Sequence, residues 1–319
     1  MLIKLWRALL IVSLLAVSVK PSYAFRLAKV SIKVVDETGK AIDAARTELC
    51  LKGGCLTKDA IRGISNSDGI FVASGNSPDG VIGGSVEKEG YYNSTFHNDF
   101  VRSSLGMWQP WNKELKVVLR QKLEPIPMYA RHRWVKVPVV GKRVAFDLMK
   151  FDWVSPYGLG IVEDFIIEVD SKYLSYDDRT STTTLSFSNK LDGIQEFKVD
   201  TGGDFGVGSA FRTPRYAPEA GYKNKITARL DTKSPGFSYQ TRDIYYFFRV
   251  RSESNAKGVL RRALYGKIKG DFRARPTKDG LAEIELFYWL NPSFTRNMEF
   301  DPKANLFSPL PWNEQVAYP

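Results

Sequence analysis

The sequence is poor in the residues that carry most enzyme chemistry. It has only two histidines, His97 and His132, and only two cysteines among 319 residues. A Ser-His-Asp triad would need one of the two histidines, and the Gly-x-Ser-x-Gly segment of many hydrolases does not occur. A metal site needs several ligands at suitable spacings. We therefore expect no catalytic residue and no metal ion.

Cofactor-binding motifs are also missing. The glycine-rich segment 201–208 lacks the lysine and the following helix that a phosphate-binding loop requires. The acidic segments 177–178, 192–193 and 200–204 lack the spacing of a calcium-binding loop. We expect no cofactor. A structural calcium ion held by oxygen atoms from distant loops stays an alternative.

Long apolar runs are scarce, and the only one lies at residues 8–19, behind the basic residues Lys4 and Arg7. It is shorter than the roughly 20 residues that cross a bilayer. The small residues of Ser22-Tyr23-Ala24 follow it, so the segment predicts a signal peptide over 1–24 with cleavage before Phe25. The protein is then exported, to the periplasm, the cell surface or the medium, with no transmembrane segment after cleavage.

Cys50 and Cys55 are separated by four residues that include Gly53-Gly54. In an oxidising compartment, this spacing is typical of a disulfide that closes a hairpin. Opposite Cα atoms in an antiparallel strand pair lie about 4.5 to 5.5 Å apart, which is within the Cα–Cα range of a disulfide. So small a loop stabilises the fold by roughly 2 kcal/mol. We predict a structural disulfide.

Charge of one sign is not grouped in blocks. The net charge is +11, and it becomes +8 once the three basic residues of the predicted signal are removed. A basic balance favours anionic partners, but a value of this size is ordinary for a soluble domain. Acidic and basic residues are interleaved, so we expect no nucleic-acid partner.

Strand signals dominate what is present. Lys29–Asp36 alternates apolar and polar residues, and turn signals such as Ser67-Asp68-Gly69 recur at short intervals. Residues 255–263 form one short helix or a loop. The pattern predicts an all-β protein whose clearest further strands are 116–119, 164–169, 182–187, 225–230, 244–251, 264–274 and 281–289.

Prolines divide the chain. Residues 121–141 contain Pro125, Pro127 and Pro138, which is typical of a stiff, extended connector. We therefore predict a β-sandwich over 25–120, a proline-rich linker over 121–141, and a larger β-rich domain over 142–319 that resembles a β-sandwich or jelly roll.

Three pieces of the first unit resemble the carboxypeptidase regulatory-like module. They are Val34-Val35-Asp36 with Gly39, Ile42 and Ala45, then 63–71, then 83–91. The resemblance implies a small prealbumin-like β-sandwich that serves as an accessory module beside other domains. It does not imply peptidase activity, because neither histidine has a glutamate at the His-x-x-Glu spacing of that zinc site. The second unit resembles only the C-terminal halves of uncharacterised bacterial exported proteins.

Carboxylates beside predicted strands keep an enzyme hypothesis open. A glycosidase needs two carboxyl groups about 5 to 10 Å apart. Glu283 and Glu285 share one face of a strand, which is also the pattern of a solvated face. The full set of candidates is Asp152, Glu163, Asp164, Glu168, Glu283 and Glu285.

Aromatic residues near turns are the most plausible binding feature. Rings beside guanidinium groups can stack on sugars or bind anionic groups, although rings in strands also fill cores. The predicted binding residues are Trp153, Tyr157, Phe211, Arg212, Arg215 and Tyr216.

We interpret the protein as a non-catalytic binding or structural protein of the bacterial envelope that contacts a glycan or an envelope protein. The alternatives are a carbohydrate-active or other hydrolase in the second domain, and an assembly or scaffold subunit.

Overall fold

The computed structural model describes residues 26–53, 59–199, 207–238 and 244–319. These residues form strands and one short 3-10 helix, Pro302–Ala304. The all-β prediction is therefore confirmed. Of the residues described, none belongs to a helix long and apolar enough to cross a bilayer. The predicted signal peptide, residues 1–24, lies outside the described residues and stays a prediction. The predicted disulfide also stays a prediction, because Cys55 lies outside the described residues, while Cys50 ends strand β2.

The first unit is a β-sandwich. Its central strand β1 binds β10 in parallel and β4 in the antiparallel direction. Its alternating sequence buries Val30, Ile32 and Val34 against the second sheet, in which β7, β5, β2 and β3 lie in that order. The strands are β1 Leu27–Val35, β2 Arg46–Cys50, β3 Ile61–Ile64, β4 Ile70–Asn76, β5 Val81–Glu87, β6 Tyr91–Tyr92, β7 Ser94–Asp99, β8 Arg102–Ser104, β9 Met107–Gln109, β10 Lys113–Val118 and β11 Arg120–Gln121.

The second unit packs a six-stranded sheet on a five-stranded one. The first has the order β12-β23-β21-β20-β17, with β22 beside β23, and the second has the order β14-β13-β15-β16-β19. Phe146, Phe165, Phe248 and Tyr288 fill the core between them. The strands are β12 Tyr129–Val137, β13 Arg143–Asp147, β14 Asp152–Trp153, β15 Phe165–Ser175, β16 Asp178–Ser186, β17 Gly193–Lys198, β18 Gly208–Ser209, β19 Lys225–Asp231, β20 Ile244–Ser254, β21 Leu260–Lys269, β22 Arg275–Pro276 and β23 Ala282–Asn291.

Three segments differ from the sequence-based expectation. The predicted strand 264–274 ends as β21 at Lys269, and residues 270–274 form a loop before β22. The predicted linker 121–141 contains β12, whose nine residues each pair with β23. Prolines flank this strand rather than interrupt it, so its backbone donors are available to the sheet. Residues 255–263 contain no helix: the Asn255 side chain accepts from the amides of Lys257 and Val259 in a turn, and β21 then begins at Leu260.

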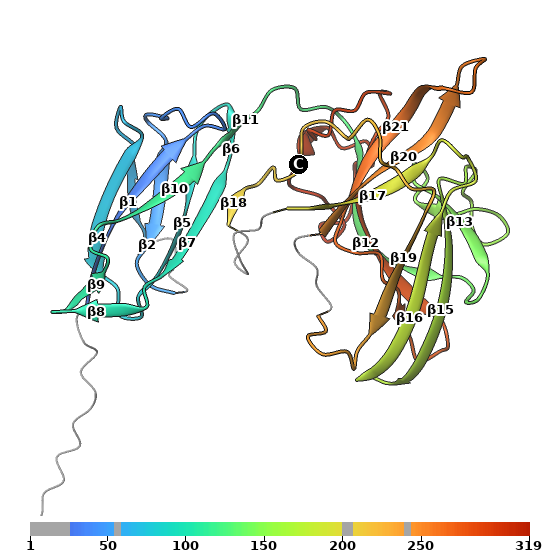
Figure 1. Cartoon of the computed structure of the whole chain (residues 1–319), viewed down its shortest axis with the longest axis horizontal. Coiled ribbons are helices and arrows are strands. Elements are labelled where there is room, and N and C mark those ends of the chain that lie inside the picture. The colour runs from blue at the N-terminus through green and yellow to red at the C-terminus, as the bar shows by residue number, and fades with distance from the viewer. Residues whose placement is uncertain (1–25, 54–58, 200–206, 239–243) are drawn as a thin grey trace, which may run out of the picture.

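The two units share a sheet. Strand β18, which comes from the second half of the chain, pairs with β7 of the first unit through Gly208 and Ser209 (Figure 1).

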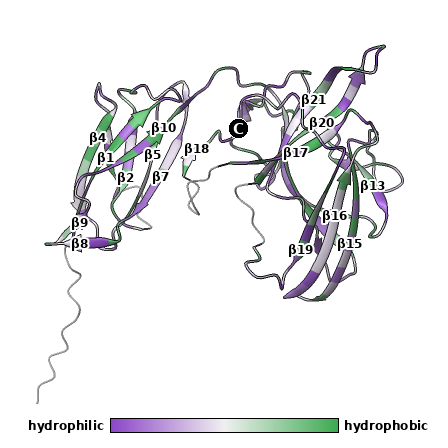
Figure 2. Cartoon of the chain, in the orientation of Figure 1, coloured by the Kyte–Doolittle hydropathy of each residue, from purple (hydrophilic) through white to green (hydrophobic). Residues whose placement is uncertain are grey.

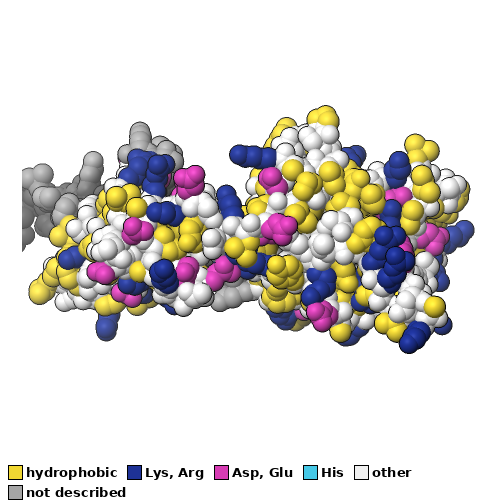
Figure 3. Space-filling view, turned by 90° about the horizontal axis from the view of Figure 1, so that it is seen from above, with side chains coloured by type: hydrophobic (Ala, Val, Ile, Leu, Met, Phe, Trp, Pro, Cys, Tyr) yellow, Lys and Arg dark blue, Asp and Glu magenta, His cyan; other side chains and the backbone are white. Residues whose placement is uncertain are grey.

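Hydrophobic residues are interspersed with polar ones along the strands of both units (Figure 2). Acidic and basic side chains are scattered among one another over the face seen in Figure 3. That face therefore carries no surface of a single charge sign.

Candidate functional site

The loop with most of the predicted binding residues lies between the two units. Phe211 is fully buried, and its ring lies 5.2 Å from the ring of Tyr92 in the first unit. The Arg120 guanidinium lies 4.4 Å from the centre of the Phe211 ring and donates to the carbonyls of Phe211 and Thr213. Both the backbone of the loop and the Phe211 ring therefore contact the first unit.

Arg215 joins the same contact through two carboxylates. It forms ion pairs with Glu37 at 2.8 Å and with the buried Glu299 at 3.0 Å. Glu299 also accepts from the Tyr92 hydroxyl at 2.9 Å. We call the group Tyr92, Arg120, Phe211, Arg215 and Glu299 the interdomain clasp, because its members come from both units.

Burial shifts the pKa of one clasp residue, Tyr92, and of Lys267, which lies beside the clasp. Desolvation, followed by the bond to Glu299, raises the pKa of Tyr92 far above its ordinary value. Lys267 is fully buried beside the clasp and donates to Thr213 Oγ1 and to the Met298 carbonyl, both at 3.1 Å. Burial, followed by repulsion from Arg120, lowers the pKa of Lys267 to about 7. These shifts follow from packing two units around polar groups.

Four of the predicted binding residues need correction or a new role. Phe211 and Arg215 belong to the clasp, so a ligand from solvent does not reach the Phe211 ring. Arg212 Nε donates to the Ser209 carbonyl at 3.3 Å, within the same loop. Trp153 is buried, and its Nε1 donates to the Lys136 carbonyl at 3.0 Å. The physical reason is that a ring beside a guanidinium packs as readily on a neighbouring domain as on a ligand.

The other two predicted residues are exposed in separate places. Tyr216 bridges to Asn297 through its backbone and leaves its ring 58% exposed. Tyr157 lies on the loop that follows β14 and is 42% exposed. The structure therefore does not bring the six predicted residues together into one site.

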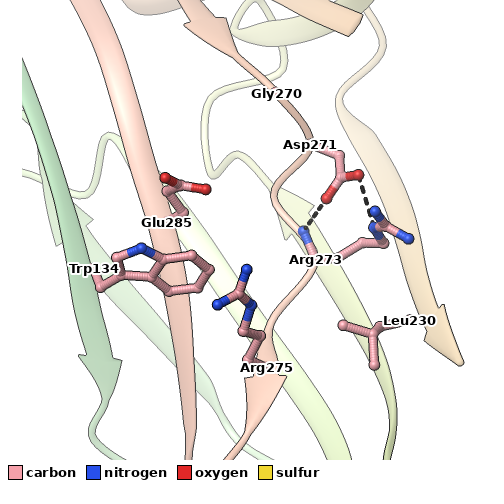
Figure 4. Close-up of a pocket in the computed structure, with 7 residues that line it drawn as sticks. All are labelled: Trp134, Leu230, Gly270, Asp271, Arg273, Arg275 and Glu285. Atoms are coloured by element: carbon pink, nitrogen blue, oxygen red, sulfur yellow. Dashed lines mark hydrogen bonds and ion pairs between the residues drawn. The ribbon is translucent and has the colours of Figure 1, made fainter. Parts of the chain in front are cut away.

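A different set of residues lines a polar groove beside strands β12 and β23 of the six-stranded sheet (Figure 4). Trp134 on β12 is the register partner of Glu285 on β23, so the two side chains share one face. The Arg275 guanidinium, from β22, lies 4.1 Å from the centre of the Trp134 ring. Glu285 Oε1 lies 2.7 Å from His132 Nε2. These contacts hold a ring, a guanidinium and a carboxylate side by side.

The loop between β21 and β22 forms the other wall. Asp271 forms an ion pair with Arg273 at 2.7 Å, and Arg273 also donates to the Ser238 carbonyl at 2.8 Å. The hollow between Trp134 and Arg273 encloses about 30 Å³, which is room for a single water molecule. Arg273 also lines an adjoining open hollow of about 410 Å³. We call the two hollows together the arginine groove; its main lining residues are Trp134, Arg229, Asp231, Phe237, Asp271, Arg273, Arg275 and Glu285.

The arginine groove has the chemistry of a binding site. Guanidinium groups donate in fixed geometry to carboxylates, and rings stack on the apolar faces of sugars. The Trp134 face is covered by Arg275, so a sugar stacks there only after that side chain moves aside. In the open hollow, the Arg273 guanidinium lies 5.6 Å from the centre of the Phe237 ring.

Sequence reasoning missed this groove because it assigned Trp134 to a linker. The signal was the alternation of residues 129–137, which places His132, Trp134 and Lys136 on one strand face. The sequence identified Glu285 as a candidate carboxylate on a strand. It did not identify Trp134 as its partner, because that depends on the register between two strands far apart in the chain. Arg273 and Arg275 come from a loop and a two-residue strand, which carry no periodic signal.

The six carboxylates of the enzyme hypothesis lie in different places. Glu285 lines the arginine groove, whereas Glu163 lines another open hollow with Arg143. Asp164 is buried and bound to Arg251 at 2.7 Å, and Asp152 accepts from the amide of Leu159. Among the described residues, no three His, Cys, Asp or Glu side chains gather as a metal site.

No family model matches the chain, and no curated protein sequence matches it. A hydroxyquinol 1,2-dioxygenase from Pseudomonas putida DLL-E4 is 13% identical, with a TM-score of 0.23; the match covers 31% of this chain and 57% of the dioxygenase. This chain thus spans less than two thirds of that enzyme's length.

Two other solved structures are similar over more of the chain. A DUF3823 family protein from Parabacteroides merdae ATCC 43184 is 12% identical over 76% of this chain and 96% of that chain, with a TM-score of 0.22. A shaft pilin from Lactobacillus rhamnosus GG is 10% identical over 77% of this chain and 94% of that chain, with a TM-score of 0.23. Likeness at this level assigns no function.

Proposed function

We propose that the protein is a non-catalytic binding protein of the bacterial envelope, and that the arginine groove binds an acidic glycan. The observation that carries this proposal is the stack of Arg275 on Trp134 at 4.1 Å, beside the open hollow lined by Arg229, Arg273 and Phe237. Rings select sugar faces, and guanidinium groups select carboxylate or phosphate substituents. An acidic glycan offers both.

The scaffold around the groove supports binding rather than turnover. The groove lies beside β12 and β23 of a six-stranded sheet that packs on a core of aromatic rings. Its three acidic side chains are already bound, Glu285 to His132, Asp271 to Arg273 and Asp231 to the amide of Lys233. Carboxylates in such pairs orient cations and ligands, whereas a glycosidase requires one carboxylic acid and one carboxylate on either side of the bond to be cleaved.

The first unit fits the same role as an accessory module. Its resemblance to the carboxypeptidase regulatory-like family, together with the predicted signal peptide, supports an extracytoplasmic protein in which this sandwich positions the second unit. The interdomain clasp gives a physical means, because Glu299 and Arg215 of the second unit bind Tyr92 and Glu37 of the first. The groove would thus be held at a fixed orientation to the first unit.

The test is titration of the chain from Phe25 with envelope polysaccharides that carry uronic acid or phosphate groups, measured by calorimetry. Trp134→Ala is expected to weaken binding about tenfold, because the Trp134 ring holds the Arg275 guanidinium in place, and such a cation–π contact contributes roughly 1 to 2 kcal/mol. Trp312→Ala is the matched control, since Trp312 is 86% exposed and is not among the groove residues. Equal losses in both variants, or no saturable binding by the unchanged chain, would contradict the proposal.

Hydrolysis is distinguished from binding in the same samples. Reducing ends are measured after prolonged incubation of the glycan with the protein and with Glu285→Gln. We expect no release above the blank with either. Release that Glu285→Gln abolishes would instead support the hydrolase alternative.

A further inference from the structure

The loop after β14 exposes three apolar side chains in a row. Its sequence, Tyr157-Gly158-Leu159-Gly160-Ile161, alternates large apolar residues with glycine. Tyr157, Leu159 and Ile161 are 42%, 85% and 72% exposed. We call these three side chains the apolar ridge. Large apolar side chains are ordinarily exposed singly, so three within five residues on one loop require an explanation.

The two glycines explain why the ridge points outward. A Cβ on Gly158 would lie 2.4 Å from the Trp153 carbonyl oxygen, and a Cβ on Gly160 would lie 2.7 Å from the Asp152 carbonyl oxygen. Both distances are far inside van der Waals contact, and both involve backbone atoms. The glycines therefore face the body of the protein, and the alternation directs the apolar residues to solvent.

Two carboxylates, of which Asp147 is buried, hold the loop in this conformation. Asp152 accepts from the amide of Leu159 at 2.8 Å, and Asp147 accepts from the amides of Ile161 and Val162 at 3.0 Å. Asp147 is itself held by Arg251 at 3.0 Å. A loop fixed by its own backbone donors loses little conformational entropy when its side chains are buried by a partner. The ridge is therefore preorganised.

The surroundings of the ridge indicate what covers it. It protrudes, and a convex apolar feature is covered either by a groove of matching shape or by a fluid surface that adapts to it. Lys150 is exposed on the turn between β13 and β14, next to the ridge. Lys142 and Arg143 are exposed at the start of β13; the acids of this segment outside the core are the exposed Glu163 and the half-buried Asp152. Apolar side chains flanked by basic ones are the pattern of peripheral binding to anionic lipid.

We propose that the apolar ridge inserts into the interfacial region of an anionic lipid surface. Leu159 and Ile161 enter the boundary between headgroups and acyl chains, Tyr157 lies at headgroup level with its hydroxyl in water, and Lys150 contacts the anionic headgroups. This inference is independent of the arginine groove, whose residues come from β12, β19 and the segment after it, β22 and the loop before it, and β23. Protein bound in this way would present its groove beside a membrane.

The first test is sedimentation with vesicles, using the chain from Phe25. That chain keeps every described strand, because β1 begins at Leu27, and it removes an apolar N-terminal run that would bind lipid by itself. Vesicles of phosphatidylcholine alone are compared with an equimolar mixture of phosphatidylcholine and phosphatidylglycerol. We expect binding to the mixture, reduced by added salt, and about tenfold weaker binding for the double variant Leu159→Ser and Ile161→Ser.

The matched control is Leu105→Ser, because Leu105 is 92% exposed but lies on the turn between β8 and β9 of the first unit. It should bind the vesicles as well as the unchanged chain does. All three substituted positions are on the surface, so unchanged thermal unfolding will show that the variants are folded. Equal losses for the ridge variant and the control would overturn the proposal, as would unchanged binding of the ridge variant.

The second test reports where the loop lies. A polarity-sensitive fluorophore attached to Leu159→Cys is expected to shift its emission to the blue when the mixed vesicles are added, whereas one on Leu105→Cys should not. Sedimentation equilibrium without lipid tests whether a second copy of the chain, rather than lipid, covers the apolar ridge. Self-association that Leu159→Ser abolishes, with no vesicle binding, would assign the ridge to a second copy of the chain and overturn the lipid proposal.

Discussion

The Tyr92 hydroxyl of the first unit donates a hydrogen bond to Glu299 Oε1 of the second, over 2.9 Å in a buried position. Glu299 also accepts from the amides of Leu123 and Glu124, which begin the connection between the units. One carboxylate thus binds the first sandwich, the connecting segment and, through Arg215, the clasp loop. Burial of such a group is tolerated because each oxygen has donors.

We expect Tyr92→Phe to lower the free energy of unfolding by about 2 kcal/mol, because it removes a buried hydrogen bond to a charged group and leaves the ring in place. Urea denaturation measures the change. Tyr216→Phe serves as the control, since that ring is 58% exposed and should change stability by less than about 0.5 kcal/mol. Equal effects would show that the hydroxyl of Tyr92 does not contribute to the clasp.

Lys267 should make stability depend on pH. Its pKa is about 7 in the folded protein and 10.5 ordinarily, so between these values the unfolded chain binds a proton that the folded chain does not. The free energy of unfolding therefore rises with pH in this window, by up to about 1.4 kcal/mol per pH unit from this group. Below pH 7 the group is protonated in both states and contributes no slope.

Lys267→Met tests this directly, because methionine fills a similar volume without a titrating group. Urea denaturation from pH 7 to about pH 9.5 should show a smaller slope for the variant than for the unchanged chain. Parallel curves would mean that the Lys267 amine keeps its proton on folding, held by the Thr213 hydroxyl and the Met298 carbonyl.

Arg251 should be more important for stability than other surface arginines. It binds Asp164 with two nitrogens, at 2.8 and 2.7 Å, and Asp147 at 3.0 Å. Burial, the largest effect, raises the pKa of Asp164. Burial is also the largest single effect on Asp147, but the amides of Ile161, Val162 and Lys150 together with Arg251 lower the pKa of Asp147. Arg251→Met leaves both carboxylates without their cation, so we expect a loss of about 3 to 5 kcal/mol in urea denaturation.

The control for Arg251 is Arg262→Met. Arg262 also forms an ion pair, with Glu253 at 2.7 Å, but both side chains are more than two fifths exposed. An exposed pair contributes at most about 1 kcal/mol. If the two variants lose the same stability, the Asp147 and Asp164 pair does not depend on Arg251.

The glycines behind the apolar ridge should not tolerate a side chain. Gly160→Ala places its Cβ 2.7 Å from the Asp152 carbonyl oxygen, so the backbone must shift, and we expect a loss of about 1 to 3 kcal/mol by urea denaturation. Gly83→Ala is the matched control, because its Cβ would meet no atom closer than 3.5 Å. A tolerated Gly160→Ala would mean that the loop can move away from the body.

The strands were predictable from single segments. Lys29–Asp36 alternates so clearly that β1, Leu27–Val35, lies within two residues of the expectation. The predicted strands 225–230 and 281–289 likewise correspond to β19 and β23. Alternation identifies strands because one face of each is buried in a core. Residues 129–137 were misassigned because the prolines around them outweighed their own alternation.

The candidate site was less predictable, for a different reason. Phe211 and Arg215 are adjacent to other rings and cations in the sequence, but only the docking of two units makes them internal. The Trp134 and Glu285 pair requires a register between strands about 150 residues apart in the chain. Local patterns do not contain such information.

The sequence by itself determined that the protein is built of strands, that it carries an apolar N-terminal run typical of a signal peptide, and that it lacks the histidines and motifs of common catalytic sites. Only the tertiary structure decided which rings are buried and which line a groove. The reason is that burial depends on what packs against a side chain, and here Tyr92 and Glu299 meet across a separation of 207 residues.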